Sequence, residues 1–150
     1  MRIIKAGTED LNGVAELFDE YRQLYNQTKN LKAAKAFISE RLANDDSKIL
    51  LAVDKDGKAV GFTQLYPAFS SVAMKPMWHL NDLYVIETSR KNGVAEALLE
   101  AARDLASTTG ALTIKLATAI DNIHAKALYE KVGYSKVIAF DHYTQKVVKS

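Results

Sequence analysis

The sequence predicts an α/β (α+β) domain in which a sheet is flanked by helices, in the order β-α-α-β-β-β-α-β-α-β-β. Runs rich in β-branched and aromatic residues alternate with stretches whose apolar residues recur at helical spacing. Asp56-Gly57 lies between two such runs and is typical of a hairpin turn. With 150 residues, 48% of them hydrophobic, the chain fits one domain over residues 1–150.

The first half of the chain predicts two helices between a short strand and a hairpin. Thr8 is a suitable cap for the first helix, and a polar break at residues 26–30 separates it from the second. The expected elements are a strand at Arg2–Ala6, a helix at Glu9–Tyr25, a helix through Ala33–Leu42, and strands at Ile49–Val53 and Ala59–Tyr66.

The second half predicts alternating strands and helices after a loop that contains Pro67 and Pro76. Gly110 and Gly133 each follow a helical pattern, at the position where a glycine commonly ends a helix. The expected elements are a strand at Trp78–Val85, a helix at Asn92–Thr108, a strand at Ala111–Thr118, a helix at Ile123–Val132, and strands at Tyr134–Phe140 and Tyr143–Val148.

Charge and cysteine content restrict the classes of function. Lysine and arginine number 20 against 18 acidic residues, and a net charge of +2 disfavours a nucleic-acid partner. Without cysteine there is no disulfide, thiolate metal site or cysteine nucleophile, and the histidines lack metal-ligand spacing, so no metal is expected. The apolar runs are strand-sized, so we expect no membrane span and a cytoplasmic location.

Two cations precede the helix expected at Asn92. Arg90 and Lys91 lie where the helix dipole favours anions, which is unfavourable by about 0.3–1 kcal/mol for each cation. A bound phosphate would reverse that sign, and the small residues Gly93 and Ala95 would let it approach the backbone amides. The pattern therefore predicts a site for a small phosphate ligand.

A structural explanation of the same residues is available. Thr88 or Ser89 could cap the helix while the two cations are solvated and the small residues allow close helix packing. Two other phosphate-binding motifs are excluded, because the three glycines of a dinucleotide fingerprint and the Gly-Lys-Ser/Thr of a Walker loop are both missing.

Arg90, Gly93 and Ala95 resemble the pyrophosphate loop of the GCN5-related N-acetyltransferase (GNAT) family, which reads Gln/Arg-x-x-Gly-x-Gly/Ala. A later family pattern, Asn-x-x-Ala-x-x-Leu-Tyr-x-x-x-Gly-Phe/Tyr, is matched by residues 122–134. The resemblance covers nearly the whole chain and implies a mixed, mostly antiparallel sheet and acetyl-CoA as acyl donor. Gly61–Tyr66 with Phe69-Ser70-Ser71 looks like the histone and polyamine acetyltransferase branch.

The resemblance also implies which residues bind the cofactor. In the family the pantetheine arm pairs with the end of the preceding strand, and the pyrophosphate lies on the loop. The residues implied here are Leu83, Tyr84, Val85, Arg90, Lys91, Asn92, Gly93, Val94, Ala95, Glu96, Asn122 and Ala125.

Tyr129 occupies the position of the family's general acid, which protonates the departing CoA thiolate. Transfer from a tyrosine of pKa about 10 to a thiolate whose conjugate acid is near ~8.5 is uphill by about 2 kcal/mol. The structural alternative is an ordinary tyrosine at the border of the core. The amine must also lose a proton, which for a lysine-like amine at pH 7 requires roughly 4.6 kcal/mol.

The base that takes this proton is not identified by the sequence. Polyamine-acetylating relatives have a glutamate at the position of Asn81, and asparagine cannot act as a base. Asp82 and His79 are the nearest titratable residues, and strand alternation would place them on opposite faces. Each could equally be a structural residue.

Acidic and aromatic residues are candidates for binding the acceptor amine. The first helix and the loop after it close over the acceptor in the resembling family, and aromatic walls add cation-π contacts of about 0.5–2 kcal/mol. The alternative is that these residues are core or solvated helix residues. The candidates are Asp19, Tyr21, Tyr25, Tyr66, Trp78 and Asn81.

The predicted function is direct transfer of an acetyl group to a primary amine of a polyamine, a small molecule or a protein. The alternative is an acyl-CoA-binding sensor or interaction module without catalysis, which the asparagine at position 81 keeps open. The final two strands could pair with another subunit, so a homodimer is expected.

Overall fold

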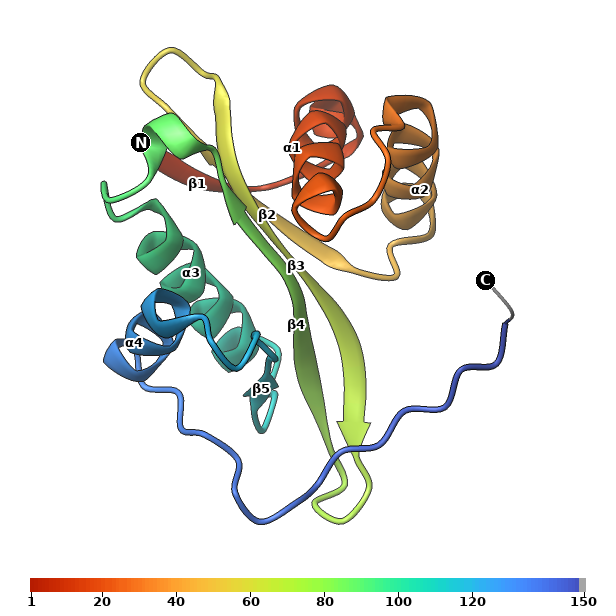
Figure 1. Cartoon of the computed structure of the whole chain (residues 1–150), viewed down its shortest axis with the longest axis vertical. Helices are drawn as coiled ribbons and strands as arrows, with labels where there is room; N and C mark the ends of the chain where they lie inside the picture. The colour runs from red at the N-terminus through yellow and green to blue at the C-terminus, as the bar shows by residue number, and fades with distance from the viewer. Residues whose placement is uncertain (149–150) are drawn as a thin grey trace. The chain divides into compact units, whose positions relative to one another are not determined.

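A computed structural model describes residues 1–148 and contains a five-stranded sheet in the order β1-β2-β3-β4-β5 (Figure 1). The pairs from β1 to β4 are antiparallel, and β4 and β5 are parallel. The strands are β1 (Arg2–Lys5), β2 (Lys48–Val53), β3 (Ala59–Ser70), β4 (Lys75–Val85) and β5 (Ile114–Lys115). This is the α/β class that the sequence predicts, with a mixed, mostly antiparallel sheet.

Helices cover both faces of this sheet. A 3₁₀ turn, η1 (Thr8–Asp10), leads into α1 (Leu11–Leu24), and α2 (Leu31–Asn44) lies beside it on one face, whereas α3 (Val94–Thr108) lies on the other (Figure 1). The Asn30 side chain caps α2 by accepting a hydrogen bond from the Ala33 amide. The core under α1 and α2 consists of Val14, Leu17, Ile38, Ile49, Leu51, Val53 and Phe62.

The hairpin of β3 and β4 is longer than the sequence predicted. Both prolines, which we expected in a loop, lie within strands, and Pro67 pairs with Trp78. Beyond Leu65 no residue of β2 pairs with β3, so one side of β3 is an edge, where the missing N–H of a proline is tolerated. The Gly57 turn of the preceding hairpin, with φ +81°, is as expected.

A β-bulge interrupts β4 near its centre. Gln64 pairs with Asp82 but Leu65 pairs with Leu80, so Asn81 is an extra residue on β4. Side chains before and after the bulge therefore do not follow simple alternation. Trp78 donates a hydrogen bond to Thr109 at the end of α3, whereas Asp82 and Tyr84 after the bulge turn toward α1.

β5 is much shorter than the predicted strand Ala111–Thr118. It pairs with β4 only at Trp78 and His79. Among residues 1–148, no strand lies on that side of β4 from Leu80 to Val85. The half of β4 that leads toward α3 thus keeps an open edge.

The chain divides into two compact units, Met1–Ala117 and Thr118–Ser150. The single-domain expectation therefore stays a prediction. In the second unit, α4 (Ile123–Lys131) begins at its cap Asn122 and ends before Gly133, which has φ +104°. The helix matches the sequence prediction.

The prediction of two final strands is wrong. They were expected at Tyr134–Phe140 and Tyr143–Val148. Residues 134–148 have no β-ladder partner within the part of the chain that the structure describes. These residues have high β-propensity, but a strand also needs an adjacent strand that forms hydrogen bonds with its backbone N–H and C=O groups.

Core packing predicts that two phenylalanines of β3 contribute very differently to the free energy of unfolding. Phe62 is fully buried under α1, whereas Phe69 is 78% exposed. We expect Phe62→Ala to lower the free energy of unfolding by about 3–5 kcal/mol. Phe69→Ala should change it by less than about 0.5 kcal/mol. Urea unfolding of both variants measures this, and equal losses would contradict the assignment of the core.

Candidate functional site

The open edge of β4 ends beside the start of α3. Gly61 on β3 allows this proximity, because a Cβ there would lie 3.0 Å from the Tyr84 carbonyl oxygen and 3.2 Å from a methyl group of Val94. Val94 is the first residue of α3 and is buried. The main chain of Leu83–Val85 and the amino end of α3 thus belong to one packed part of the fold.

The amino end of α3 has no side-chain cap. Thr88 and Ser89, the alternative caps, lie in the 3₁₀ turn η2 (Glu87–Ser89), and the N-cap residue is Gly93. Lys91 and Gly93 have positive φ angles of 66° and 77°. The helix begins two residues later than predicted and presents its first amides without a capping side chain, which is an arrangement that suits an anion.

Arg90 connects this loop to β4. Its Nε donates a hydrogen bond of 2.9 Å to the Val85 carbonyl oxygen, and its guanidinium carbon lies 5.8 Å from the centroid of the Tyr84 ring. Part of its hydrogen-bonding capacity is therefore used to hold the loop against the strand end. Lys91 and Asn92 are exposed in the same loop.

On the α1 face, tyrosines gather over the bulge. The Tyr21 hydroxyl donates to the Asn81 carbonyl oxygen at 3.2 Å, and its ring lies 5.1 Å from Tyr25 and 6.4 Å from Tyr84 between centroids. The Tyr84 hydroxyl donates to Glu20 at 3.2 Å. These contacts bring together Tyr21, Tyr25 and Asn81, which the sequence proposed for the acceptor amine.

Asp82 lies at the centre of a buried polar chain. Ser47 donates to Gln64 Oε1 at 2.9 Å, which orients the amide so that Gln64 Nε2 donates to Asp82 Oδ2 at 2.6 Å. Asn81 Nδ2 donates to the other carboxylate oxygen at 3.0 Å. Burial of the carboxylate favours its neutral form, whereas its hydrogen bonds with Gln64, Asn81 and Tyr21 favour its charged form.

Burial dominates this balance. It raises the pKa of Asp82 above 3.8, against the opposing effects of the hydrogen bonds and of the charge on His79. Burial and the nearby Asp82 charge also raise the pKa of Tyr21, and they raise the pKa of Tyr66 to about 12. The phenols of both tyrosines are therefore neutral at physiological pH.

The bulge changes our expectation for His79 and Asp82. Trp78 turns toward α3, so the adjacent His79 turns toward the face of α1. Asp82 contacts residues of that same face, because one extra residue lies between them. The two titratable side chains lie on the same face, and the prediction of opposite faces is wrong.

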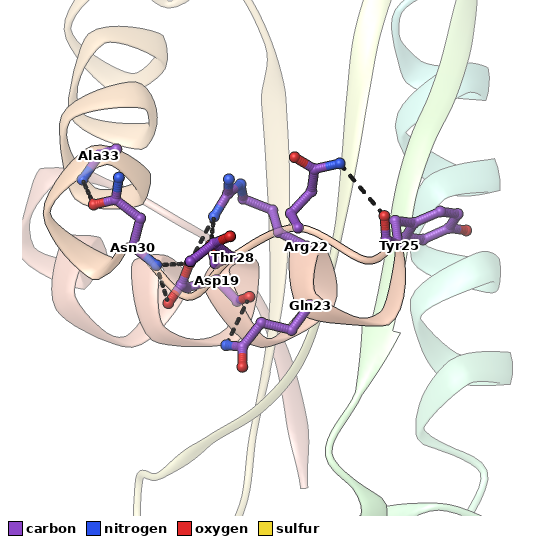
Figure 2. Close-up of polar contacts among 8 residues, drawn as sticks. Asp19, Arg22, Gln23, Tyr25, Thr28, Asn30 and Ala33 are labelled. Carbon is purple, nitrogen blue, oxygen red and sulfur yellow. Dashed lines mark hydrogen bonds and ion pairs between the residues drawn. The ribbon is translucent and has the colours of Figure 1, made fainter. Parts of the chain in front are cut away.

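The Asp19 carboxylate is occupied by contacts with neighbouring residues of the protein (Figure 2). It is buried, pairs with Arg22 at 2.8 Å and accepts hydrogen bonds of 3.1 and 3.3 Å from the Asn30 amide. Arg22 also donates to the Thr28 carbonyl oxygen at 3.3 Å. Asp19 thus fastens the connection between α1 and α2.

Trp78 and Tyr66 lie on opposite faces of the β3–β4 hairpin. The Trp78 indole donates to Thr109 at 2.9 Å, which places its side chain on the α3 face of the sheet. Tyr66 is half-buried and pairs with His79 across the β3–β4 hairpin. The structure therefore does not bring Trp78 together with Tyr21 and Tyr25.

The second unit contains the later sequence motif. The Asn122 side chain accepts a hydrogen bond of 3.1 Å from the Ala125 amide and so caps α4. The rings of Tyr129 and Tyr134 are 5.9 Å apart between centroids. Burial, with a smaller effect of Tyr129, raises the pKa of Tyr134 to about 12.

The described residues contain neither a metal-binding cluster nor a helix that could span a membrane. Within residues 1–148, no three His, Cys, Asp or Glu side chains are grouped so that they could hold a metal ion. No helix in this range is both long enough and apolar enough to span a membrane.

Sequence reasoning missed Gln64 and Ser47, which complete the chain to Asp82, and Glu20 as the partner of Tyr84. A signal for Gln64 was present, because a glutamine within the apolar run of β3 must find a buried partner. Nothing in the sequence shows that the partner would be Asp82, since this depends on the register of the bulge.

Comparison with known proteins matches residues 13–134 to a family model described as the acetyltransferase (GNAT) family. The chain is 45% identical over 143 residues to the uncharacterized N-acetyltransferase YhfO of Bacillus subtilis (strain 168), with 95% of each chain covered. It is 34% identical over 104 residues to a probable acetyltransferase of Haemophilus influenzae, covering 69% of this chain and 71% of that one.

A solved structure has the same fold. The crystal structure of a probable acetyltransferase superposes with a TM-score of 0.95 at 37% identity, over 100% of both chains. The histone and polyamine branch stays a prediction.

The raised pKa of Asp82 predicts how stability depends on pH. Its favourable contribution is complete below the unfolded pKa near 3.8 and is lost as pH rises through the higher folded pKa. The unfolding free energy of the wild type minus that of Asp82→Asn should therefore fall as pH rises from about 4. Urea unfolding at several pH values measures this difference. A difference that rises with pH would mean that hydrogen bonding, not burial, dominates.

Proposed function

Because the chain belongs to the acetyltransferase (GNAT) family and is an N-acetyltransferase, we propose that it transfers the acetyl group of acetyl-CoA directly to a primary amine. The observation that carries this proposal is the open edge of β4 beside the uncapped amino end of α3. The acceptor would be a polyamine, another small amine or a protein amine.

The acyl donor would lie along two backbone surfaces. The pantetheine arm would pair with the open edge at Leu83, Tyr84 and Val85, as an added strand does. The pyrophosphate would accept hydrogen bonds from the first amides of α3. Residues proposed for the pyrophosphate end are Arg90, Lys91, Asn92, Gly93, Val94, Ala95 and Glu96, and Asn122 and Ala125 of the second motif are proposed for the pantetheine.

The acceptor amine would approach from the α1 face. Tyr21, Tyr25 and Asn81 supply aromatic surface and carbonyl oxygens there, and Tyr66 is added from β3. Asp19 is left out because Arg22 and Asn30 occupy its carboxylate, and Trp78 because it turns to the other face. The amine must lose a proton before it attacks. Asp82 and His79 are the titratable groups proposed to assist this proton transfer.

Tyr129 is proposed as the general acid. As the amine nitrogen forms its bond to the acetyl carbon and the carbon–sulfur bond breaks, the phenol would give its proton to the departing thiolate. This role depends on the family motif at residues 122–134, which the family model includes.

We further propose that the protein acts as a homodimer in the cytoplasm. The absence of cysteine suits a reducing compartment. The exposed apolar residues near the carboxyl end suit a protein partner.

Amine-dependent release of the CoA thiol tests the function. We expect acetyl-CoA incubated with the protein to release thiol when amines from a panel of polyamines, small amines and peptide amines are added. Tight CoA binding without stimulation by any amine would favour the non-catalytic sensor.

Two glycines form a matched pair for the cofactor site. Gly93 and Gly110 both have positive φ, of 77° and 72°, and both have open space where a Cβ would lie. Glutamate at either position therefore adds a similar strain of about 1–2 kcal/mol. Gly93→Glu also places a negative charge where phosphate would bind, so we expect CoA affinity to fall at least about tenfold, or 1.4 kcal/mol. Calorimetric titration measures the CoA affinity of both variants. Equal losses of affinity would exclude the loop at Gly93 from the CoA site.

Tyr129→Phe should lower turnover by about 100-fold or more while leaving CoA affinity unchanged, because only the proton donor is removed. Tyr134→Phe is the control, since it removes a neighbouring phenol from the same unit. Thiol release gives turnover and titration gives affinity. Equal turnover of the two variants would remove Tyr129 from the proposed role.

A further inference from the structure

A hydrogen-bonded path leads from the surface of α1 to the buried Asp82 carboxylate. Tyr25 is 64% exposed, Tyr21 is half-buried and Asp82 is only 4% exposed. The side chain of Tyr21 is hydrogen-bonded both to that of Tyr25 and to the Asp82 carboxylate. Its hydroxyl also donates to the Asn81 carbonyl oxygen at 3.2 Å, which holds it beside the bulge. A proton at the surface of α1 therefore has a route to the carboxylate through phenol groups.

Two other buried side chains fix the Asp82 carboxylate. Gln64 Nε2 donates to Asp82 Oδ2 at 2.6 Å, and Ser47 Oγ donates to Gln64 Oε1 at 2.9 Å. Gln64 is fully buried and Ser47 is 8% exposed. Because the serine hydroxyl occupies the amide oxygen, the glutamine presents its N–H, and not its carbonyl, to the carboxylate.

Stability alone does not account for this arrangement. A buried ionised group with polar partners is often no more stable than well-packed apolar residues of similar volume. Burial raises the pKa of Asp82 and so brings it closer to neutral pH, where a proton acceptor is more effective. Burial also raises the pKa of Tyr21, so its phenol stays neutral and can accept one proton while it gives up another.

We propose that the Tyr21 hydroxyl relays a proton from the acceptor amine to the Asp82 carboxylate. The proton of the amine passes to the phenol oxygen as the phenol's own proton passes to a carboxylate oxygen, so Tyr21 ends neutral and Asp82 ends protonated. The electron pair left on the nitrogen then attacks the acetyl carbon. Ser47 and Gln64 are positioning residues, which hold the carboxylate against Tyr21 without touching the amine. The relay rests on the proposed acetyl transfer and supplies the route of its first proton.

Several charged or titratable side chains surround Asp82 and its tyrosines, and each of them affects the pH dependence. The opposite charges that follow α2 have opposing effects on Tyr66, and the charge on His79 favours the ionised form of Asp82. The groups are Glu20, Tyr21 and Tyr25 of α1, Arg41 of α2 with Asp46 after it, Tyr66 of β3, and His79 and Tyr84 of β4.

The pH dependence of turnover tests the positioning residues. Gln64→Met removes a hydrogen bond that lowers the pKa of Asp82, so the acidic limb of turnover should move to higher pH. Turnover itself should fall about tenfold or more, because the carboxylate loses its fixed position. Ser47→Ala should move the limb in the same direction by less, since it removes only the group that orients the amide.

Thr63→Val is the matched control. Thr63 is fully buried on β3 and donates to the main-chain oxygen of Asp82 at 2.7 Å, so its loss disturbs Asp82 without removing a partner of its carboxylate. Its acidic limb and turnover should equal those of the wild type. All the titratable groups near Asp82 are retained in these three variants, so His79 cannot produce a difference between them.

Tyr21→Phe tests the relay itself. Turnover should fall about 100-fold or more while CoA affinity is unchanged, because the group that passes the proton is removed. Thiol release from acetyl-CoA with spermidine, benzylamine and lysine amide as acceptors gives turnover. A carbon-13 NMR titration of the Asp82 carboxyl carbon gives its pKa in each variant without any amine.

The outcomes separate the relay from acetyl transfer. A wild type whose thiol release none of these amines stimulates would overturn both. Stimulated release with unchanged turnover in Tyr21→Phe would overturn the relay alone. If Gln64→Met and Ser47→Ala had the same acidic limb and the same Asp82 pKa as Thr63→Val, the positioning role would be overturned, and Ser47→Ala decides this where Gln64→Met does not fold.

Discussion

The separation of β4 from β5 after His79 is the constraint on which the rest of the site depends. Two paired residues hold β5 against β4, and beyond them no strand pairs with that side of β4 among the residues described. Unpaired backbone groups are obligatory hydrogen-bonding groups, so an edge left open inside a packed fold favours a ligand that can pair with it. The amino end of α3 has the same property, because no side chain caps it.

The bulge at Asn81 gives the other face of β4 its chemistry. One extra residue turns Asp82 and Tyr84 toward α1, while Trp78 packs at the end of α3. Without this residue Asp82 would face the wrong helix, and Gln64 would lack its partner. Burying a carboxylate next to half-buried tyrosines is unfavourable for stability. Such buried titratable groups are common at functional sites.

Much of the fold could be predicted from the sequence because local patterns determine it. Asp56-Gly57 predicts its hairpin, and the apolar spacing of α1 and α3 predicts both helices within two residues of their observed ends. Pro67 and Pro76 were expected in a loop but lie in strands. A strand tolerates proline where its N–H side is a sheet edge, and the local sequence does not show which side that is. The final two strands failed for a related reason, since composition gives a segment β-propensity but not a neighbour.

The positions of the candidate site residues could be predicted where they depend on the main chain, and less so where they depend on strand register. Gly93, Ala95 and the strand end at Val85 follow from a short motif. The link from Ser47 through Gln64 to Asp82 depends on a bulge with no local sequence signal. Asp19 was misleading because the loop that uses its carboxylate comes eleven residues later in the chain.

Hydrogen–deuterium exchange with and without acetyl-CoA tests the central claim most directly. If the open edge of β4 and the start of α3 bind the acyl donor, the backbone amides of residues 83–85 and 93–96 will exchange more slowly in its presence, while those of β1 will not change. Saturating acetyl-CoA that protects neither stretch, or that protects only residues elsewhere, would contradict the account.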